Sequence, residues 1–199
     1  MGTTKTLYIY GAGGHGLVCA DIAKANGYEN IIFLDDNPKP DISALCFHED
    51  LEKYDIFVAI GSAFHREKLL EKVCAAGFNL VSLIHPSAII SSSASIEKGV
   101  CVMPRAVINA KALIKTGAII NTGAIIEHEC VIGEFAHICP AAALAGGVDI
   151  GKSAWIGIGS SVIQNIKIGA NALIGAGSVV VKNIPENSKA YGNPAKIKN

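Results

Sequence analysis

The sequence lacks a long apolar stretch and an excess of charge of either sign. No uncharged apolar run approaches the ~18 residues that a membrane-spanning helix needs, so no membrane span is expected. The 17 basic and 17 acidic residues cancel, which argues against binding to nucleic acid or to a membrane surface through net charge. Charged residues make up only 17% of the chain and hydrophobic ones 50%, so the sequence predicts a folded protein.

Signals for secretion and for metal binding are also missing. The first residues lead directly into a strand-like apolar segment without a signal peptide, so the cytoplasm is the expected compartment. No two of the six cysteines form a Cys-x-x-Cys pair, which predicts neither a zinc site nor a disulfide framework. These cysteines are Cys19, Cys46, Cys74, Cys101, Cys130 and Cys139.

Up to about residue 82, strand-like and helix-like segments alternate. Short apolar runs predict strands, and two longer segments that each end before a glycine predict helices. This alternation is typical of parallel βαβ units, here one half of a Rossmann fold, and we assign residues 1–82 to such a domain. The predicted strands cover 7–10, 31–34, 56–60 and 79–83, and the predicted helices 17–26 and 66–76.

From Leu83 the period of the sequence changes to six. Residues 83–184 divide into 17 hexads without insertion, and the second position of every hexad is Ile, Leu or Val. The sixth position is small or aliphatic throughout. This repeat predicts a parallel β-helix with three hexads in each triangular coil, followed by a tail over 185–199. General crossover chirality alone favours a right-handed coil.

A glycine-rich loop follows the first predicted strand. Residues 11–16 read Gly-Ala-Gly-Gly-His-Gly and match the G-x-G-x-x-G pattern. Gly13, Gly14 and His15 thus stand where free N–H groups at a helix N-terminus bind phosphate. A purely structural tight turn is the alternative. Because only one half of a dinucleotide fold is present, the loop indicates a single nucleotide rather than NAD.

Polar residues follow two further strands of the predicted sheet. Asp35 and Asp36 end the second strand, and Asp35 lies 19 residues after Gly16, where a carboxylate can accept hydrogen bonds from ribose hydroxyls. Gly61 and Ser62 end the third strand. All four belong to the carboxyl edge, where ligands of open α/β sheets bind.

One hexad, residues 125–130, is unusually charged because it contains Glu127, His128 and Glu129. A neutral imidazole beside a carboxylate is a competent general base near neutral pH. A solvated bend without function is the alternative, and the spacing fits no common metal site. His137 follows nine residues later, half of an 18-residue coil, so the two histidines meet only across a neighbouring subunit or by a path round the prism.

Three features together resemble one family. They are the hexapeptide repeat, the Gly-Gly-His-Gly loop and the tail 192–196, Gly-Asn-Pro-Ala-Lys. The chain resembles sugar acetyltransferases of the sialic-acid O-acetyltransferase type, with bacterial UDP-4-amino-sugar N-acetyltransferases of the UDP-bacillosamine pathway as the nearest match. The resemblance extends from about residue 7 to residue 196 and is most specific in the glycine loop and the Glu-His-Glu hexad.

This resemblance implies a homotrimer of left-handed β-helices, with acetyl-CoA bound between adjacent prisms and no metal. The first domain would hold a UDP-4-amino sugar. The residues implied to contact this nucleotide sugar are Gly13, Gly14, His15, Asp35 and Asp36.

For the second domain the resemblance implies both the catalytic and the acetyl-CoA-binding residues. His128 would be the general base, and Glu129 would increase its basicity. His137, Ile158 and Ala176 would line the acetyl-CoA site, chiefly through backbone groups.

The expected activity is N-acetylation of the sugar 4-amino group, and protein glycosylation, lipopolysaccharide and capsule are all open as destinations of the product. O-acetylation of sialic acid or another surface sugar is the second candidate. A catalytically inert nucleotide-sugar-binding trimer is the third, and an NAD-linked oxidoreductase a distant fourth.

Overall fold

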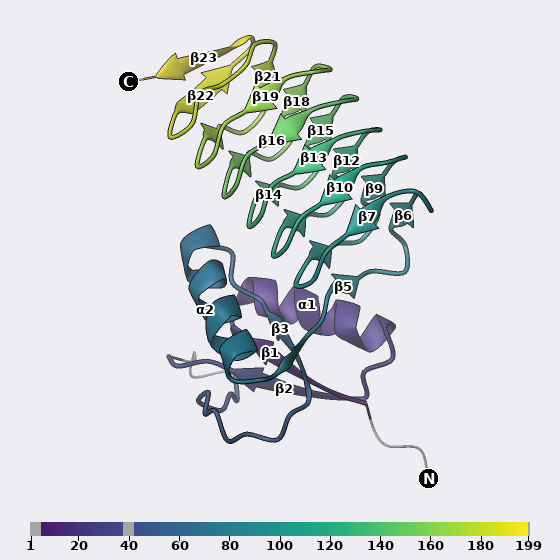
Figure 1. Ribbon diagram of the computed structural model, residues 1–199, viewed down its shortest axis with the longest axis vertical. Coiled ribbons are helices and arrows are strands. Elements are labelled where there is room, and N and C mark those ends of the chain that lie inside the picture. The colour runs from purple at the N-terminus through teal and green to yellow at the C-terminus, as the bar shows by residue number, and fades with distance from the viewer. Residues whose placement is uncertain (1–4, 38–41, 199) are drawn as a thin grey trace. The chain divides into compact units, whose positions relative to one another are not determined.

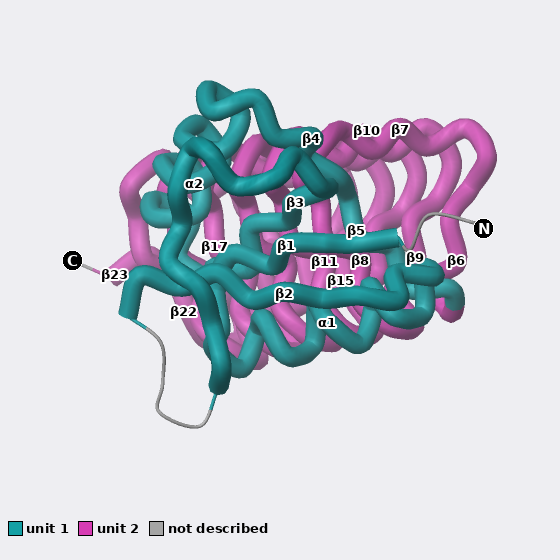
Figure 2. The backbone as a smooth tube through the Cα atoms, turned by 90° about the horizontal axis from the view of Figure 1, so that it is seen from below, with its two compact units in different colours: residues 1–86 teal, residues 87–199 magenta. Residues whose placement is uncertain are grey.

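The computed structural model describes residues 5–37 and 42–198. The chain divides into two compact units, residues 1–86 and residues 87–199, which Figure 2 colours separately. The first predicted hexad, residues 83–88, spans this division.

The first unit is built on a parallel sheet with the strand order β2-β1-β3-β4. Every residue of the central strand β1 is buried, as expected for a parallel strand that has neighbours on both sides. The predicted βαβ architecture is therefore confirmed. The elements are β1 (Thr6–Tyr10), α1 (Gly14–Ala25), β2 (Asn30–Leu34), β3 (Asp55–Val58), α2 (Ala63–Ala75), β4 (Asn79–Leu80) and β5 (Leu83–Ile84).

The elements differ from the prediction mainly at their ends. α1 begins at Gly14, three residues before the predicted start, with Gly13 as its N-cap. Glycine is a poor helix former, so propensity alone places the start too late. A Cβ at Gly16 would lie 2.0 Å from the carbonyl oxygen of Gly11, so this close approach admits only glycine. The predicted strand 79–83 is two short strands, β4 and β5.

The second unit is a solenoid of two-residue strands (Figure 1). Each strand from β6 to β21 occupies the first two positions of one hexad, which confirms the predicted period. Each strand from β9 to β18 pairs in parallel with the strands three before and three after it, as β10 does with β7 and β13. The result is a triangular parallel β-helix, left-handed as in hexapeptide-repeat proteins.

The three faces of this β-helix are three separate sheets. One contains β6 (Ile89–Ile90), β9 (Val107–Ile108), β12 (Ile125–Ile126), β15 (Ala143–Leu144), β18 (Ser161–Val162) and β21 (Val179–Val180). The next contains β7 (Ser95–Ile96), β10 (Leu113–Ile114), β13 (Val131–Ile132), β16 (Asp149–Ile150) and β19 (Lys167–Ile168). The last includes β8 (Cys101–Val102), β11 (Ile119–Ile120), β14 (His137–Ile138), β17 (Trp155–Ile156) and β20 (Leu173–Ile174).

The hexad positions have constant roles along the solenoid. From Val102 to Val180 every second-position side chain is buried, and these residues form the core. From Gly99 to Gly177 every fifth-position residue has a positive φ, because the chain turns each corner through a left-handed residue. Glycine takes this conformation at little cost, whereas other residues are strained there.

A hairpin follows the last coil. β22 (Lys189–Gly192) pairs in parallel with β20 and antiparallel with β23 (Ala195–Lys198), so it extends the face that contains β14 and β17. No disulfide joins any of the six cysteines, all of which lie in the described part of the chain. Within residues 5–37 and 42–198, neither helix is long and apolar enough to cross a membrane.

Candidate active site

A cavity of about 760 Å³ opens at the carboxyl edge of the first unit's sheet. Its walls come from the ends of β1 and β2, from the segment after β3 and from α2, which is the edge where open α/β sheets bind ligands. The cavity is lined by Tyr10, Gly11, Asp35, Asp36, Asn37, Ile60, His65, Lys68 and Leu69.

The two predicted aspartates both line this cavity. The carboxylate of Asp35 accepts hydrogen bonds from the backbone N–H groups of Ala12 at 2.8 Å and Asn37 at 2.9 Å, so it also holds the glycine loop in place. Asp36 accepts a hydrogen bond of 2.7 Å from the Tyr10 hydroxyl. Burial, followed by this bond, raises the pKa of Tyr10, so the tyrosine is a neutral donor.

Five other predicted residues are not among the described residues that line the cavity. Gly13 and Gly14 form the start of α1. The carbonyl of Gly61 accepts a hydrogen bond from the buried guanidinium of Arg66. The Ser62 hydroxyl caps α2 by accepting a hydrogen bond from a backbone N–H group. In the structure these residues shape the loops around the cavity.

His15, the fifth of these residues, is neutral at physiological pH. Burial, followed by the nearby charge of Arg66, lowers its pKa to about 4. Its Nε2 atom lies 3.8 Å from the Cys19 thiol. His15 can therefore donate or accept a hydrogen bond, but it brings no positive charge to a phosphate.

Sequence reasoning missed the wall that α2 contributes. His65 and Lys68 are three residues apart on this helix and both line the cavity, since residues three apart share a helix face. The signal was present in the sequence, because Ser62 is a typical N-cap directly before them. Lys68 brings the positive charge that His15 lacks.

In the second unit, His128 and Glu129 form one corner of the β-helix between β12 and β13. The Nδ1 atom of His128 lies 3.2 Å from the Glu129 carboxylate, and both side chains are about 60% exposed. Glu129 has φ 60°, so it is a non-glycine residue in the strained fifth position. The imidazole lies beside Gly146, one coil further on, where an added Cβ would be 2.4 Å from Nε2.

A cleft of about 430 Å³ brings together His137, Ile158 and Ala176. It runs along one edge of the prism, which is formed by the corners that follow the stacked strands β11, β14, β17 and β20. Trp155 is the only tryptophan of the sequence, and its ring lies 4.3 Å from the His137 ring, centroid to centroid. The other lining residues are Asn121, Cys139, Pro140, Gly157, Leu173, Ile174 and Gly175.

The polar end of this cleft has a defined hydrogen-bonding pattern. The Nδ2 group of Asn121 lies 3.0 Å from Nε2 of His137. Because an amide nitrogen only donates, Nε2 is the acceptor and the imidazole proton is on Nδ1. Burial raises the pKa of the Cys139 thiol to about 12, so this sulfur remains protonated and unreactive.

The structure brings the predicted acetyl-CoA residues together but leaves His128 apart from them. His128 lies at the corner that follows β12, whereas the cleft follows the corner after β14. A single chain thus presents the histidine–carboxylate pair at one edge of the prism and the cleft at another.

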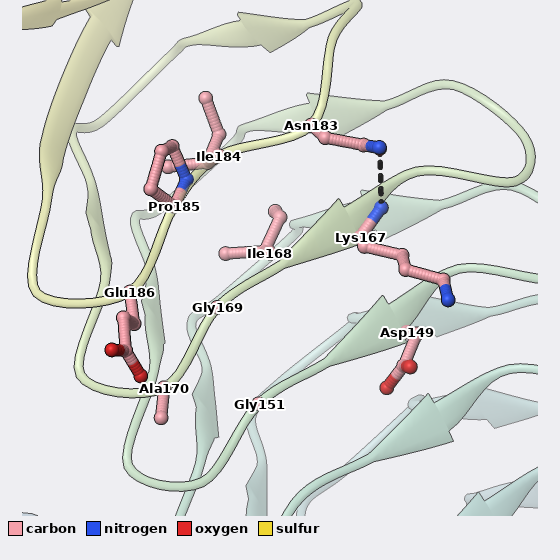
Figure 3. A pocket seen from close by; sticks show the side chains of 10 residues that line it. All are labelled: Asp149, Gly151, Lys167, Ile168, Gly169, Ala170, Asn183, Ile184, Pro185 and Glu186. Carbon is pink, nitrogen blue, oxygen red and sulfur yellow. Dashed lines mark hydrogen bonds between the residues drawn. The ribbon is translucent and has the colours of Figure 1, made fainter.

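A further cavity of about 460 Å³ contains none of the predicted site residues (Figure 3). It lies beside β16 and β19, where the side chain of Asn183 accepts a hydrogen bond from the backbone N–H of Lys167 at 2.9 Å. No group of three His, Cys, Asp or Glu side chains suited to a metal ion occurs within the described part of the chain.

The loop-bearing α/β unit and the cleft of the β-helix define a hexapeptide-type acyltransferase. Family comparison agrees with this class. The model described as the PglD N-terminal domain matches residues 6–73, and the model described as bacterial transferase hexapeptide (six repeats) matches residues 147–182.

Solved structures give the particular family. The acetyltransferase domain of PglB from Neisseria gonorrhoeae, in complex with acetyl coenzyme A, is 38% identical with a TM-score of 0.92, and the match covers 98% of this chain and 100% of that one. Perosamine N-acetyltransferase from Caulobacter crescentus, a histidine mutant in complex with CoA and GDP-perosamine, is 40% identical with a TM-score of 0.91, covering 98% and 97%. WeeI from Acinetobacter baumannii, 23% identical over 97% of this chain and 99% of that one, shares the fold with a TM-score of 0.85. The chain belongs to the hexapeptide-repeat sugar N-acetyltransferases.

Proposed function

We propose that this protein transfers the acetyl group of acetyl-CoA to the 4-amino group of a UDP-linked amino-dideoxy sugar. The observation that carries this proposal is the His128–Glu129 pair, a solvent-accessible imidazole held 3.2 Å from a carboxylate. The relatives in complex with acetyl coenzyme A and with a GDP-linked amino sugar support the two substrate classes.

The cavity of the first unit has the chemistry for a nucleotide sugar. Its acidic side, Asp35 and Asp36, suits ribose hydroxyls and the N–H groups of a base, and Lys68 and His65 on α2 suit a diphosphate. Uridine is the base that the sequence resemblance favours. Guanosine is the second candidate, since the Caulobacter relative is in complex with GDP-perosamine.

The cleft of the second unit suits the pantetheine arm of acetyl-CoA. Trp155 and Leu173 supply an apolar wall, and Gly157 and Gly175 let the coils stack closely along it. A long, thin ligand with amide groups can lie in such a groove and form hydrogen bonds with backbone groups. We assign His137, Ile158 and Ala176 to this contact.

A complete site then requires more than one copy of the chain. The cleft and the His128 corner lie at different edges of one prism, so prisms packed side by side are needed to place the imidazole at the cleft. We propose a homotrimer in which each acetyl-CoA site takes His128 from a neighbouring protomer.

In the proposed mechanism His128 acts as general base. The Glu129 carboxylate accepts a hydrogen bond from the protonated Nδ1 atom of His128. The lone pair of Nε2 is then free to accept the proton of the attacking amine. The amine nitrogen forms a bond to the thioester carbonyl carbon while backbone N–H groups stabilise the oxyanion. The C–S bond then breaks, and the protonated His128 returns the proton to the CoA sulfur. Binding of the nucleotide by the first unit orients the amine.

Release of free CoA thiol over a panel of acceptors tests the proposal. We expect turnover with a UDP-4-amino sugar. Turnover with the GDP-linked sugar alone would replace uridine by guanosine, and turnover with a free sialic acid would replace N-acetylation by O-acetylation. No thiol release with any acceptor would instead identify an inert nucleotide-sugar-binding protein.

A further inference from the structure

Two serines interrupt an otherwise nonpolar series at the sixth hexad position. Ser160 and Ser178 lie at the same corner of successive coils, and both are fully buried. Every other sixth position, from Ala88 to Ile184, is Ala, Val, Ile or Cys. At this one corner the preceding coils have Ala88, Ala106, Ala124 and Ala142.

Both hydroxyl groups donate hydrogen bonds to the same acceptor. The carbonyl oxygen of Gly175 accepts from Ser160 at 2.9 Å and from Ser178 at 2.7 Å. The Ser160 hydroxyl also accepts from the backbone N–H of Ser178 at 3.3 Å, and the Ser178 hydroxyl accepts from that of Gly192 at 3.2 Å. The hydrogen bonds compensate the cost of burying two hydroxyls, which alanine at the same corner avoids.

The acceptor belongs to the wall of the cleft. Gly175 and Ala176 line it together, and the carbonyl of Gly175 shares one planar peptide unit with the N–H of Ala176. In a trans peptide these two groups point in opposite directions. Two buried hydroxyls that hold the carbonyl toward the interior therefore direct the Ala176 N–H away from it, toward the cleft.

We propose that Ser160 and Ser178 are positioning residues for acetyl-CoA. They fix the Gly175–Ala176 peptide so that the Ala176 N–H donates a hydrogen bond to an amide carbonyl of the pantetheine arm. This inference rests on the proposed function of the cleft. It also explains why serine replaces alanine only at the last two coils of this corner. At this corner only Ser160 and Ser178 are close enough to donate hydrogen bonds to the carbonyl of Gly175.

The variants Ser160→Ala and Ser178→Ala test this role. Each is expected to raise the KM for acetyl-CoA roughly three- to tenfold, the value of one hydrogen bond, with kcat and the KM for the nucleotide sugar nearly unchanged. Because Trp155 is the single tryptophan and lines the cleft, its fluorescence reports the Kd of acetyl-CoA directly. That Kd is expected to rise by the same factor as KM.

Val100→Ala is the matched control, because Val100 is a fully buried sixth-position residue in an early coil. This truncation is expected to lower Tm without changing the Kd for acetyl-CoA. Serine variants that bind acetyl-CoA as tightly as the wild type, or a control that weakens binding equally, would overturn the positioning role. If the Trp155 fluorescence of the wild-type protein does not change when acetyl-CoA is added, the proposed function of the cleft is overturned instead.

Discussion

The imidazole of His128 occupies the space that a side chain at Gly146 would need. The two residues lie at the same corner of successive coils, and an added Cβ at Gly146 would be 2.4 Å from both Cε1 and Nε2 of the ring. The histidine therefore rests on a backbone surface that only glycine leaves open. This contact fixes one side of the ring, and Glu129 fixes the other.

Gly146→Ala is expected to reduce activity more than stability. The added methyl group pushes the imidazole aside, and the ring can rotate into solvent because it is largely exposed. We expect kcat to fall at least about tenfold, as for a misplaced general base, while Tm changes by no more than a few degrees. Steady-state kinetics and a thermal melt measure the two effects. Unchanged kcat would show that Gly146 does not set the position of the ring.

His128→Ala is expected to lower kcat by roughly 10²–10⁴. The side chain is exposed, so the fold and the oligomeric state should be retained. His48→Ala is the control, since His48 is also exposed and is outside the lining of the cavities described above. Turnover close to that of the wild type in the His128 variant would remove this residue from the mechanism.

Glu129→Gly is expected to separate stability from function. Glycine relieves the left-handed strain at φ 60°, which raises the free energy of unfolding by up to about 1 kcal/mol, but it removes the partner of His128. Lys111→Gly is the matched variant, one coil earlier at the same position with φ 58°. Chemical denaturation should show a gain in both variants, and kcat should fall only in the first. Equal kcat in both variants would contradict a role for Glu129.

His15 is expected to make the first unit sensitive to acid. Its pKa is lowered to about 4 in the folded protein by burial, against about 6.5 in the unfolded chain. The unfolded state thus binds more protons between these values, so the His15 contribution is complete above about pH 6.5 and is lost as the pH falls toward 4. Urea unfolding across this window should show a weaker pH dependence for His15→Asn than for the wild type. Identical slopes would contradict a half-buried His15 that stays neutral in the folded protein.

Much of the fold could be predicted from the sequence. The second-position aliphatics, such as Ile126 and Ile132, must all face the core of one prism, so a strict period of six leaves one architecture and one register. The period does not determine the hand of the coil, and crossover chirality alone favours the wrong one. Glycine loops and helix caps have weaker local signals. The early start of α1 depends on the close approach of Gly16 to the carbonyl of Gly11. This contact joins two backbone segments, and no periodic pattern in the sequence signals it.

The candidate site was predictable where residue chemistry is local. His128 and Glu129 are adjacent in sequence, and Asp35 follows its strand directly, so their grouping needs no tertiary information. Lys68 and Tyr10 come from separate elements, and only the packing of α2 beside the sheet makes them line one cavity. The lining does not include the predicted loop residues Gly13, Gly14 and His15, because they form the N-cap and the first turn of α1.

The sequence by itself determined the repeat, the division of the chain into an α/β unit and a prism, and the adjacency of His128 and Glu129 at one corner. All three follow from interactions between residues close along the chain or related by a fixed spacing. The tertiary structure alone decided that the Gly146 backbone supports the imidazole and that two buried serines share one carbonyl of the cleft wall. Such contacts join neighbouring coils, and their distances depend on how closely the coils stack rather than on the identity of any single residue.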